Sequence, residues 1–279
     1  MTIESDYPAP AKLNLMLRVT GRRADGYHLL QTVFRFIDYS DTLRFTLRTD
    51  GAIVRAVEIP GVAEADDLTL RAARLLKQVS GTTHGVAITL DKRLPLGGGL
   101  GGGSSNAATT LIVLNRLWGL NLSRARLQAL ALELGADVPV FVFGESALGE
   151  GIGELLQPIK LSPAWYLVLL PPVAVSTMRV FQAPDLKRDS NPIKIPPFSF
   201  AAGGNEFEPV VCRLYPEIGQ YLRWLGRFGP AAVTGSGACV FAQFDDEPAA
   251  RAVMQQLPVG MHGVVVRGLD HHPLREMSV

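Results

Sequence analysis

The pattern of hydrophobic and polar positions in the first fifty residues predicts three β-strands. Leucine occupies every second position of Leu13–Leu17, which suits a strand with one polar-lined face. Leu29–Asp38 is typical of a second strand, and the regular alternation of Leu43–Leu47 predicts a third. The segment Gly21–Gly26, between the first two, has the polar and glycine residues of a turn.

The next part of the chain changes to the period of helices. Asp66 or Asp67 can cap a helix that runs to about Val79, and Gly81 follows where that helix should end. The other elements predicted in this part are a strand at Val86–Leu90, a helix opened by Ser104 or Ser105 that ends at Leu117, a helix from Ser123 to Leu134, and strands that return after residues 135–139 and continue to about Gln157.

Composition shifts near Gly153–Pro158, and we expect a domain boundary there, between residues 1–155 and 156–279. Prolines become frequent from Pro158 to Pro209, which predicts loops and short elements. The elements predicted after that are a helix near Leu214–Arg227, a strand Ala231–Val233, a strand Ala238–Phe244, a helix Pro248–Leu257 and a strand Gly263–Arg267. Helices and strands in segregated blocks indicate an α+β fold, not a repeated βαβ winding.

Composition limits the class of protein. The chain has 279 residues, 47% apolar and 19% charged, so it can bury a large core. Its net charge is +1 and it has no run of Lys and Arg, which argues against a nucleic-acid partner. The two cysteines, Cys212 and Cys239, fit neither a disulfide framework nor a zinc site.

The apolar segments of the sequence predict neither secretion nor insertion into a membrane. Residues 1–12 lack the apolar segment of a signal peptide. The longest apolar run, Trp165–Val175, is short and is broken by two prolines, so it cannot cross a bilayer of about 30 Å. We therefore expect a soluble cytoplasmic protein.

The most informative stretch is a glycine-rich loop. Glycines let backbone N–H groups approach a ligand closely, and the start of the following helix adds unpaired donors and the positive end of its dipole. A triphosphate suits that geometry, whereas a flexible linker is seldom followed directly by a capped apolar helix. The residues we expect to bind nucleotide are Pro95, Leu96, Gly97, Gly98, Gly99, Leu100, Gly101, Gly102, Gly103, Ser104 and Ser105.

Three common phosphate-binding motifs do not match this loop. No lysine follows it, as the Walker A motif requires. Gly97, Gly99 and Gly102 fit GxGxxG, but no acidic residue lies between Asn106 and Leu132 to bind a ribose. The paired motifs of protein kinases are also absent from the sequence.

Two charged residues are candidates for chemistry, and the sequence leaves each with a second interpretation. Asp137 lies between Gly135 and Pro139, where it is either a catalytic base or a simple turn residue. Lys12 lies in an otherwise apolar strand, where it either protects a sheet edge or directs its charge into a site. Phosphoryl transfer needs a base and a fixed positive charge of this kind.

Five segments occur in an order that resembles the superfamily of galactokinase, homoserine kinase, mevalonate kinase and phosphomevalonate kinase. The segments are Pro8–Leu15, Gly21–His28, the loop from Pro95, Gly135–Pro139 and Thr234–Cys239. Together they cover most of the chain. Gly26-Tyr27-His28 is the most specific segment, because it is similar to the branch of the superfamily that acts on a cytidyl diphosphate sugar alcohol.

The resemblance implies a fold, a reaction and a set of site residues. It implies a two-domain small-molecule kinase fold with mixed or antiparallel sheets, with the active site in the cleft between an ATP-binding catalytic domain and a substrate-binding domain. The reaction is ATP-dependent phosphorylation of a 2-hydroxyl, with Mg²⁺, in non-mevalonate isoprenoid biosynthesis. Lys12 and Asp137 match the catalytic pair, and the residues that match substrate contacts are Asn14, Tyr27, His28, Thr177 and Phe181.

Several points stay open from sequence. Stacking of cytosine between Tyr27 and Phe181 is physically reasonable, and His28 could bond the base or serve the structure alone. Gly235-Ser236-Gly237 is either a turn that closes on a ligand or an ordinary hairpin turn, and no acidic ligand for magnesium can be assigned. The alternatives are a homoserine or sugar kinase, or a non-catalytic nucleotide-binding module. We expect a monomer or weak homodimer.

Overall fold

The computed structural model describes residues 5–194, 198–200 and 203–278. In these residues one sheet of eleven strands joins the two halves of the chain, and its main path runs β3-β4-β2-β11-β7-β10-β9. The strands are β1 Tyr7–Arg22, β2 His28–Arg48, β3 Ile53–Arg55, β4 Gly85–Asp91, β5 Ala147–Glu150, β6 Leu155–Pro158, β7 Trp165–Leu169, β8 Gly204–Asn205, β9 Ala231–Val233, β10 Val240–Phe244 and β11 Gly263–Leu269.

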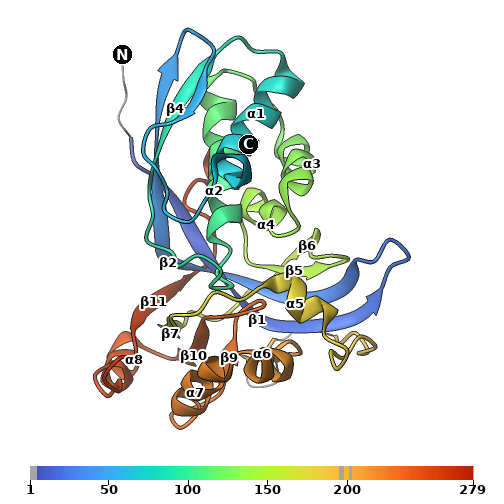
Figure 1. Cartoon of the computed structure of the whole chain (residues 1–279), viewed down its shortest axis with the longest axis vertical. Coiled ribbons are helices and arrows are strands. Elements are labelled where there is room, and N and C mark those ends of the chain that lie inside the picture. The colour runs from blue at the N-terminus through green and yellow to red at the C-terminus, as the bar shows by residue number, and fades with distance from the viewer. Residues whose placement is uncertain (1–4, 195–197, 201–202, 279) are drawn as a thin grey trace.

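Helices cover this sheet in two groups, one over each half (Figure 1). The first group is α1 Leu68–Ser80, α2 Gly102–Leu117, α3 Arg124–Leu134 and α4 Val138–Phe143. The second is α5 Thr177–Gln182, α6 Glu208–Leu214, α7 Pro216–Leu225 and α8 Glu247–Met254, and two 3-10 turns are Glu64–Asp66 and Arg275–Ser278. None of the helices in the described residues has both the length and the hydrophobicity of a membrane span.

The helix termini follow local sequence signals. Asp67 caps α1 by accepting a hydrogen bond from Thr69 N, and Gly81 ends the helix in a left-handed conformation. Ser123 caps α3 through Arg126 N, as expected. The helix after the glycine loop starts differently from our prediction: α2 begins at Gly102, with Gly101 before it, and neither Ser104 nor Ser105 caps it.

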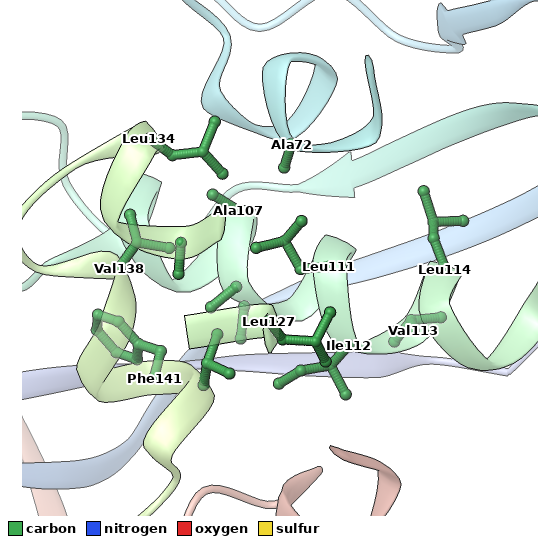
Figure 2. Packing of buried hydrophobic residues seen from close by; sticks show 14 of the residues in the cluster. Ala72, Ala107, Leu111, Ile112, Val113, Leu114, Leu127, Leu134, Val138 and Phe141 are labelled. Carbon is green, nitrogen blue, oxygen red and sulfur yellow. The ribbon is translucent and has the colours of Figure 1, made fainter. Parts of the chain in front are cut away.

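Each group of helices buries its own hydrophobic core. In the first, α2 lies between α1, α3 and α4 and the sheet, and Figure 2 shows Leu111, Leu127 and Phe141 among the side chains of this core. In the second, α6 and α7 pack on β10 and neighbouring strands, with Val211 and Leu225 fully buried. The two cores fix the positions of the loops that lie between the two groups of helices.

Two predicted boundaries were wrong in the first half. The strands expected at 29–38 and 43–47 form the single strand β2, which pairs with β1, β4, β5 and β11. Asp41, between the two predicted strands, lies inside this strand and is fully buried. The strand around Leu13–Leu17 has no exposed polar face, because Asn14 and Met16 are buried as well.

Other differences lie in the second half. The turn at 135–139 leads into the short helix α4 before the strands return. The helix expected near 214–227 is α7, and a separate helix that was not predicted, α6, precedes it. The proline-rich stretch 158–209 contains β7 and α5, as short elements, while Pro196 and Pro197 lie outside the described residues. Both cysteines are free, Cys239 buried and Cys212 partly buried.

Candidate active site

A cavity of about 900 Å³ lies where the glycine loop, β1, β2, α4 and α5 meet. It collects most of the residues singled out in the sequence. Those that line it are Lys12, Asn14, Tyr27, His28, Gly97, Gly99, Gly101, Ser104, Asp137, Thr177 and Phe181, together with the turn Gly235, Ser236 and Gly237. Those that do not line it are Pro95, Leu96, Gly98, Leu100, Gly102, Gly103 and Ser105.

Lys12 and Asp137 meet in this cavity. Lys12 Nζ lies 3.2 Å from Asp137 Oδ2, and the lysine is buried while the aspartate side chain is 41% exposed. Asp137 directly precedes α4, and its carboxylate forms no cap bond with that helix. The carboxylate is therefore paired on one side and open to the cavity on the other.

The lysine ammonium is fixed in place by further partners. Lys12 Nζ donates to Asn14 Oδ1 at 2.5 Å and to Gly99 O at 3.1 Å. An ammonium has three protons, so these two bonds and the Asp137 pair use all of its donors. Lys12 is 2% exposed and lines the cavity, so its charge is directed into a site and does not protect an exposed sheet edge.

Asn14 is held from both sides as well. Its Nδ2 donates to Thr32 Oγ1 at 2.9 Å, and its backbone N–H donates to Thr234 Oγ1 at 3.0 Å. Thr32, which the sequence analysis missed, and Thr234, the first residue of one of the five matched segments, therefore orient the residue that orients Lys12. Thr234 is 220 positions from Asn14 along the chain, and no local pattern could reveal that contact.

The glycine loop is shaped by close contact with the segment 234–239. Gly99 has a φ of 74°, and a Cβ on it would lie 2.1 Å from Thr234 O. The backbone N–H of Cys239 donates to Gly98 O at 3.0 Å. The side chain of Cys239 is buried there, and this burial raises the pKa of its thiol to about 12. The loop needs glycine both for its backbone conformation and for this contact.

A buried carboxylate that the sequence analysis missed supports the start of the loop. Asp41 accepts hydrogen bonds from Arg93 N at 2.7 Å and Leu94 N at 2.8 Å. Lys92 Nζ donates to it at 2.8 Å and Asn106 Nδ2, on α2, at 3.0 Å. Asp41 therefore links β2, the entry of the glycine loop and the helix that follows it.

The far end of the cavity is aromatic. His28 stacks on Phe181 with ring centroids 4.8 Å apart, and Phe207 packs edge-on against Phe181 at 4.9 Å. Tyr27 lines the cavity beside them and is 59% exposed. In the structure the side-chain ring stacked on Phe181 is thus His28, and Tyr27, which was predicted to stack on a base with Phe181, lines the same end of the cavity.

Two contacts close the wall between the glycine loop and the aromatic end. Thr177 Oγ1 and Ser236 Oγ lie 2.7 Å apart, which joins α5 to the turn at 235–237. Arg188 Nε donates to His28 Nε2 at 3.0 Å. Arg188 was not singled out in the sequence, because it lies in a stretch without a recognisable pattern.

Glu150, which nothing in the sequence distinguished, accepts a hydrogen bond from Gln31 Nε2 at 3.2 Å.

Comparison with known proteins identifies the family. Residues 67–145 match the "GHMP kinases N terminal domain" and residues 188–259 match the "GHMP kinases C terminal" domain. The chain is 63% identical over 268 residues to the 4-diphosphocytidyl-2-C-methyl-D-erythritol kinase of Thiobacillus denitrificans, with 96% of each chain covered. This chain is a GHMP kinase of the 4-diphosphocytidyl-2-C-methyl-D-erythritol kinase family.

Two further comparisons agree with membership of this GHMP kinase family. The protein of the same name from Nitrosospira multiformis is 59% identical, over 99% of this chain and 95% of that one. A crystal structure of a 4-(cytidine 5'-diphospho)-2C-methyl-D-erythritol kinase superposes with a TM-score of 0.81 and 32% identity, and the match covers 95% of this chain and 99% of that one. The predicted resemblance and the α+β GHMP kinase fold are therefore confirmed.

Proposed function

We propose that this protein uses ATP to phosphorylate the 2-hydroxyl of 4-diphosphocytidyl-2-C-methyl-D-erythritol, a step of non-mevalonate isoprenoid biosynthesis. The observation that carries the proposal is the Lys12–Asp137 pair, which lies in one cavity with the glycine loop and the aromatic residues His28 and Phe181. The names of relatives that are more than half identical over nearly the whole chain support the substrate. The chain is thus an ATP-dependent small-molecule kinase.

In the proposed step, Asp137 takes the proton of the substrate hydroxyl. The hydroxyl oxygen forms a bond to the γ-phosphorus of ATP while the bond from that phosphorus to the β–γ bridging oxygen breaks, and ADP leaves. The open side of the Asp137 carboxylate supports this role, because a base must reach its proton by hydrogen bonding.

Lys12 has a separate part in the same step. Its ammonium pairs with the Asp137 carboxylate and places a positive charge near the transferring phosphoryl group. The bonds to Asn14 and Gly99 support this part, because a charge that is already held in place needs no reorganisation during the reaction.

The glycine loop and the first turn of α2 bind the β and γ phosphates in this proposal. Gly97, Gly99, Gly101 and Ser104 line the cavity, and α2 is sixteen residues long. The N-terminus of such a helix favours negative charge. The members of the predicted set that face away from the cavity, among them Gly98 and Ser105, contribute by shaping the loop.

Magnesium fits this site as an ion that arrives with the nucleotide. In the described residues, no group of three His, Cys, Asp or Glu side chains could form a complete metal site. Mg²⁺ usually takes one or two carboxylates together with water and substrate phosphates, and Asp137 and Ser104 both line the cavity. When bound, the ion would neutralise phosphate charge.

The cytidyl end of the substrate lies against the aromatic end of the cavity in this proposal. Phe181 and Tyr27 offer faces for the base, and His28 and Thr177 offer hydrogen bonds. We also propose a domain boundary near residue 155, a cytoplasmic location, and a monomer or weak homodimer without a nucleic-acid partner. The boundary is supported by the two family domains, which lie on either side of it.

A coupled assay of ADP release tests the proposed substrate. The cytidyl diphosphate substrate, homoserine and mevalonate are each supplied with ATP and Mg²⁺. We expect turnover with the cytidyl substrate alone. Turnover only with homoserine or mevalonate would make the protein a different kinase of the superfamily, and ATP binding without turnover on any of the three would favour a non-catalytic module.

A further inference from the structure

Arg188 is bonded more completely than a surface arginine needs. It lies in the cavity wall just after α5, and its Nε donates to His28 Nε2 at 3.0 Å. The other two nitrogens donate to backbone carbonyls: Nη1 to Leu186 O at 2.9 Å, and Nη2 to Phe181 O at 2.8 Å and Ala183 O at 2.7 Å. The carbonyls fix the plane of the guanidinium, so they also fix the direction of its Nε–H.

This bond decides which nitrogen of His28 carries the proton. A guanidinium is a donor only and stays charged, so His28 Nε2 must offer its lone pair. In a neutral imidazole the proton then lies on Nδ1, since the bond made by one ring nitrogen sets the state of the other. Burial, followed by the charges of Arg188 and Arg22, lowers the pKa of His28, which favours the neutral ring.

The free nitrogen of the ring is available to a ligand. Within the described residues His28 Nδ1 has no hydrogen-bond partner, and His28 lines the cavity beside Phe181. Stacking on Phe181, with 28° between the planes, holds the orientation of the ring. His28 therefore offers the cavity one N–H donor in a fixed plane and no acceptor.

We propose that Arg188 is a positioning residue that sets base specificity, by holding His28 as the Nδ1–H tautomer that can only donate to the base. Cytosine N3 has a lone pair and accepts such a bond, whereas uracil N3 carries a proton that would face the donor. A buried polar group left without its partner is a strong basis for rejecting an analogue. This inference rests on the proposed cytidyl substrate.

The tautomer can be measured in the wild-type protein by NMR with ¹⁵N-labelled histidine, with the His28 signals assigned through His28→Gln. We expect Nδ1 to be protonated and Nε2 to be unprotonated at neutral pH. In Arg188→Met, which removes the donor and keeps an apolar stem, the Nε2–H form should appear. A protonated Nε2 in the wild type would overturn the proposal, whatever the activity.

Base specificity is measured by calorimetry with cytidine diphosphate and uridine diphosphate, while a non-hydrolysable ATP analogue occupies the glycine loop. We expect Arg188→Met to reduce the preference for cytidine diphosphate about tenfold, the size of one hydrogen bond. The KM for the cytidyl substrate should rise more than kcat falls, because the hydrogen bonds of Arg188 go to His28 and to backbone carbonyls and not to Asp137. An unchanged preference in a folded Arg188→Met would overturn the proposal.

The matched control is Arg213→Met. Arg213 is bonded to Asp185, three residues from Arg188, through contacts of 2.8 and 2.6 Å, and it has no contact with His28. This variant should keep the wild-type tautomer and the wild-type base preference. If the wild type fails to phosphorylate the cytidyl substrate, the proposed function fails, but the tautomer result still decides the role of Arg188.

Discussion

Lys12 Nζ lies 3.2 Å from Asp137 Oδ2, although 125 positions separate the two residues along the chain. β1 supplies the lysine and the turn before α4 supplies the aspartate. Asn14 and Gly99 hold the ammonium from the other side, so the position of the carboxylate is set by a charge that cannot move freely. A base held in this way presents its free oxygen to the cavity.

Replacement of Asp137 should therefore affect chemistry more than binding. Asp137→Asn keeps the shape of the side chain but cannot accept the proton, and a general base typically contributes about 10² to 10⁴ in rate. We expect kcat to fall by that range while ATP affinity, measured by calorimetry, stays near the wild-type value. A variant that turns over at nearly the normal rate would refute the assignment of Asp137 as the base.

The glycine loop should tolerate substitution unevenly. Gly99→Ala places a methyl group against Thr234 O in a backbone conformation that costs about 1–3 kcal/mol for other residues. We expect a lower Tm and a much higher KM for ATP. Gly103→Ala lies in α2 with only Leu68 nearby, at 3.6 Å, and should keep nearly normal values of both.

Gly119→Ala separates the two causes of the Gly99 effect. Gly119 has a φ of 65° and open space around the position of a Cβ, so the variant carries the backbone strain without the contact. It should lower Tm slightly and leave the KM for ATP unchanged. Equal effects of Gly99→Ala and Gly119→Ala on that KM would show that contact with Thr234 is unimportant.

Asp41 should contribute strongly to stability despite its polar character. Asp41→Ala leaves the Lys92 ammonium, 18% exposed, and three further donors without their acceptor. Breaking a buried pair in this way costs about 3 kcal/mol or more, which urea unfolding can measure. The control is Asp50→Ala, at an exposed ion pair with Arg48, which should leave the midpoint nearly unchanged. Similar midpoints for the two variants would contradict the role given to Asp41.

We expect the buried His272 to lower the free energy of unfolding in acid. Complete burial lowers its pKa from 6.5 to about 3, so the folded protein keeps the ring neutral where the unfolded chain takes up a proton. Because the unfolded state then binds more protons, this contribution is lost as pH falls from about 6.5 towards 3, at up to about 1.4 kcal/mol per pH unit. Urea unfolding of wild type and His272→Gln at pH 7 and pH 5 should show a smaller loss in the variant, and equal losses would exclude His272 as the cause.

Elements with local signals could be predicted from the sequence. The cap at Asp67, the stop at Gly81 and the strand Ala231–Val233 all depend on neighbouring residues, and the structure confirms them. The two strands that merged into β2 show where such signals mislead. Asp41 lies between those two predicted strands, and an isolated carboxylate is costly to bury, but Lys92 and Asn106 compensate it from distant positions.

In the candidate site, too, some residues could be predicted from the sequence and others could not. The glycine loop and the short motifs around Lys12 and Asp137 could be found because their residue types are unusual in their local setting. Arg188 could not, since its role depends on a bond to His28, 160 positions away. Thr234 was part of a matched segment, but its bond to Asn14, 220 positions away, could not be predicted. Only the paired strands β1 and β2 and the docked loops bring those residues together.

A crystal structure with the cytidyl diphosphate substrate and a non-hydrolysable ATP analogue tests the central proposal most directly. It should place the 2-hydroxyl oxygen within about 2.6–3.2 Å of an Asp137 carboxylate oxygen, with the triphosphate on the glycine loop and the base beside His28. A substrate hydroxyl separated from Asp137 by more than one water molecule, or a triphosphate bound away from the loop, would contradict it.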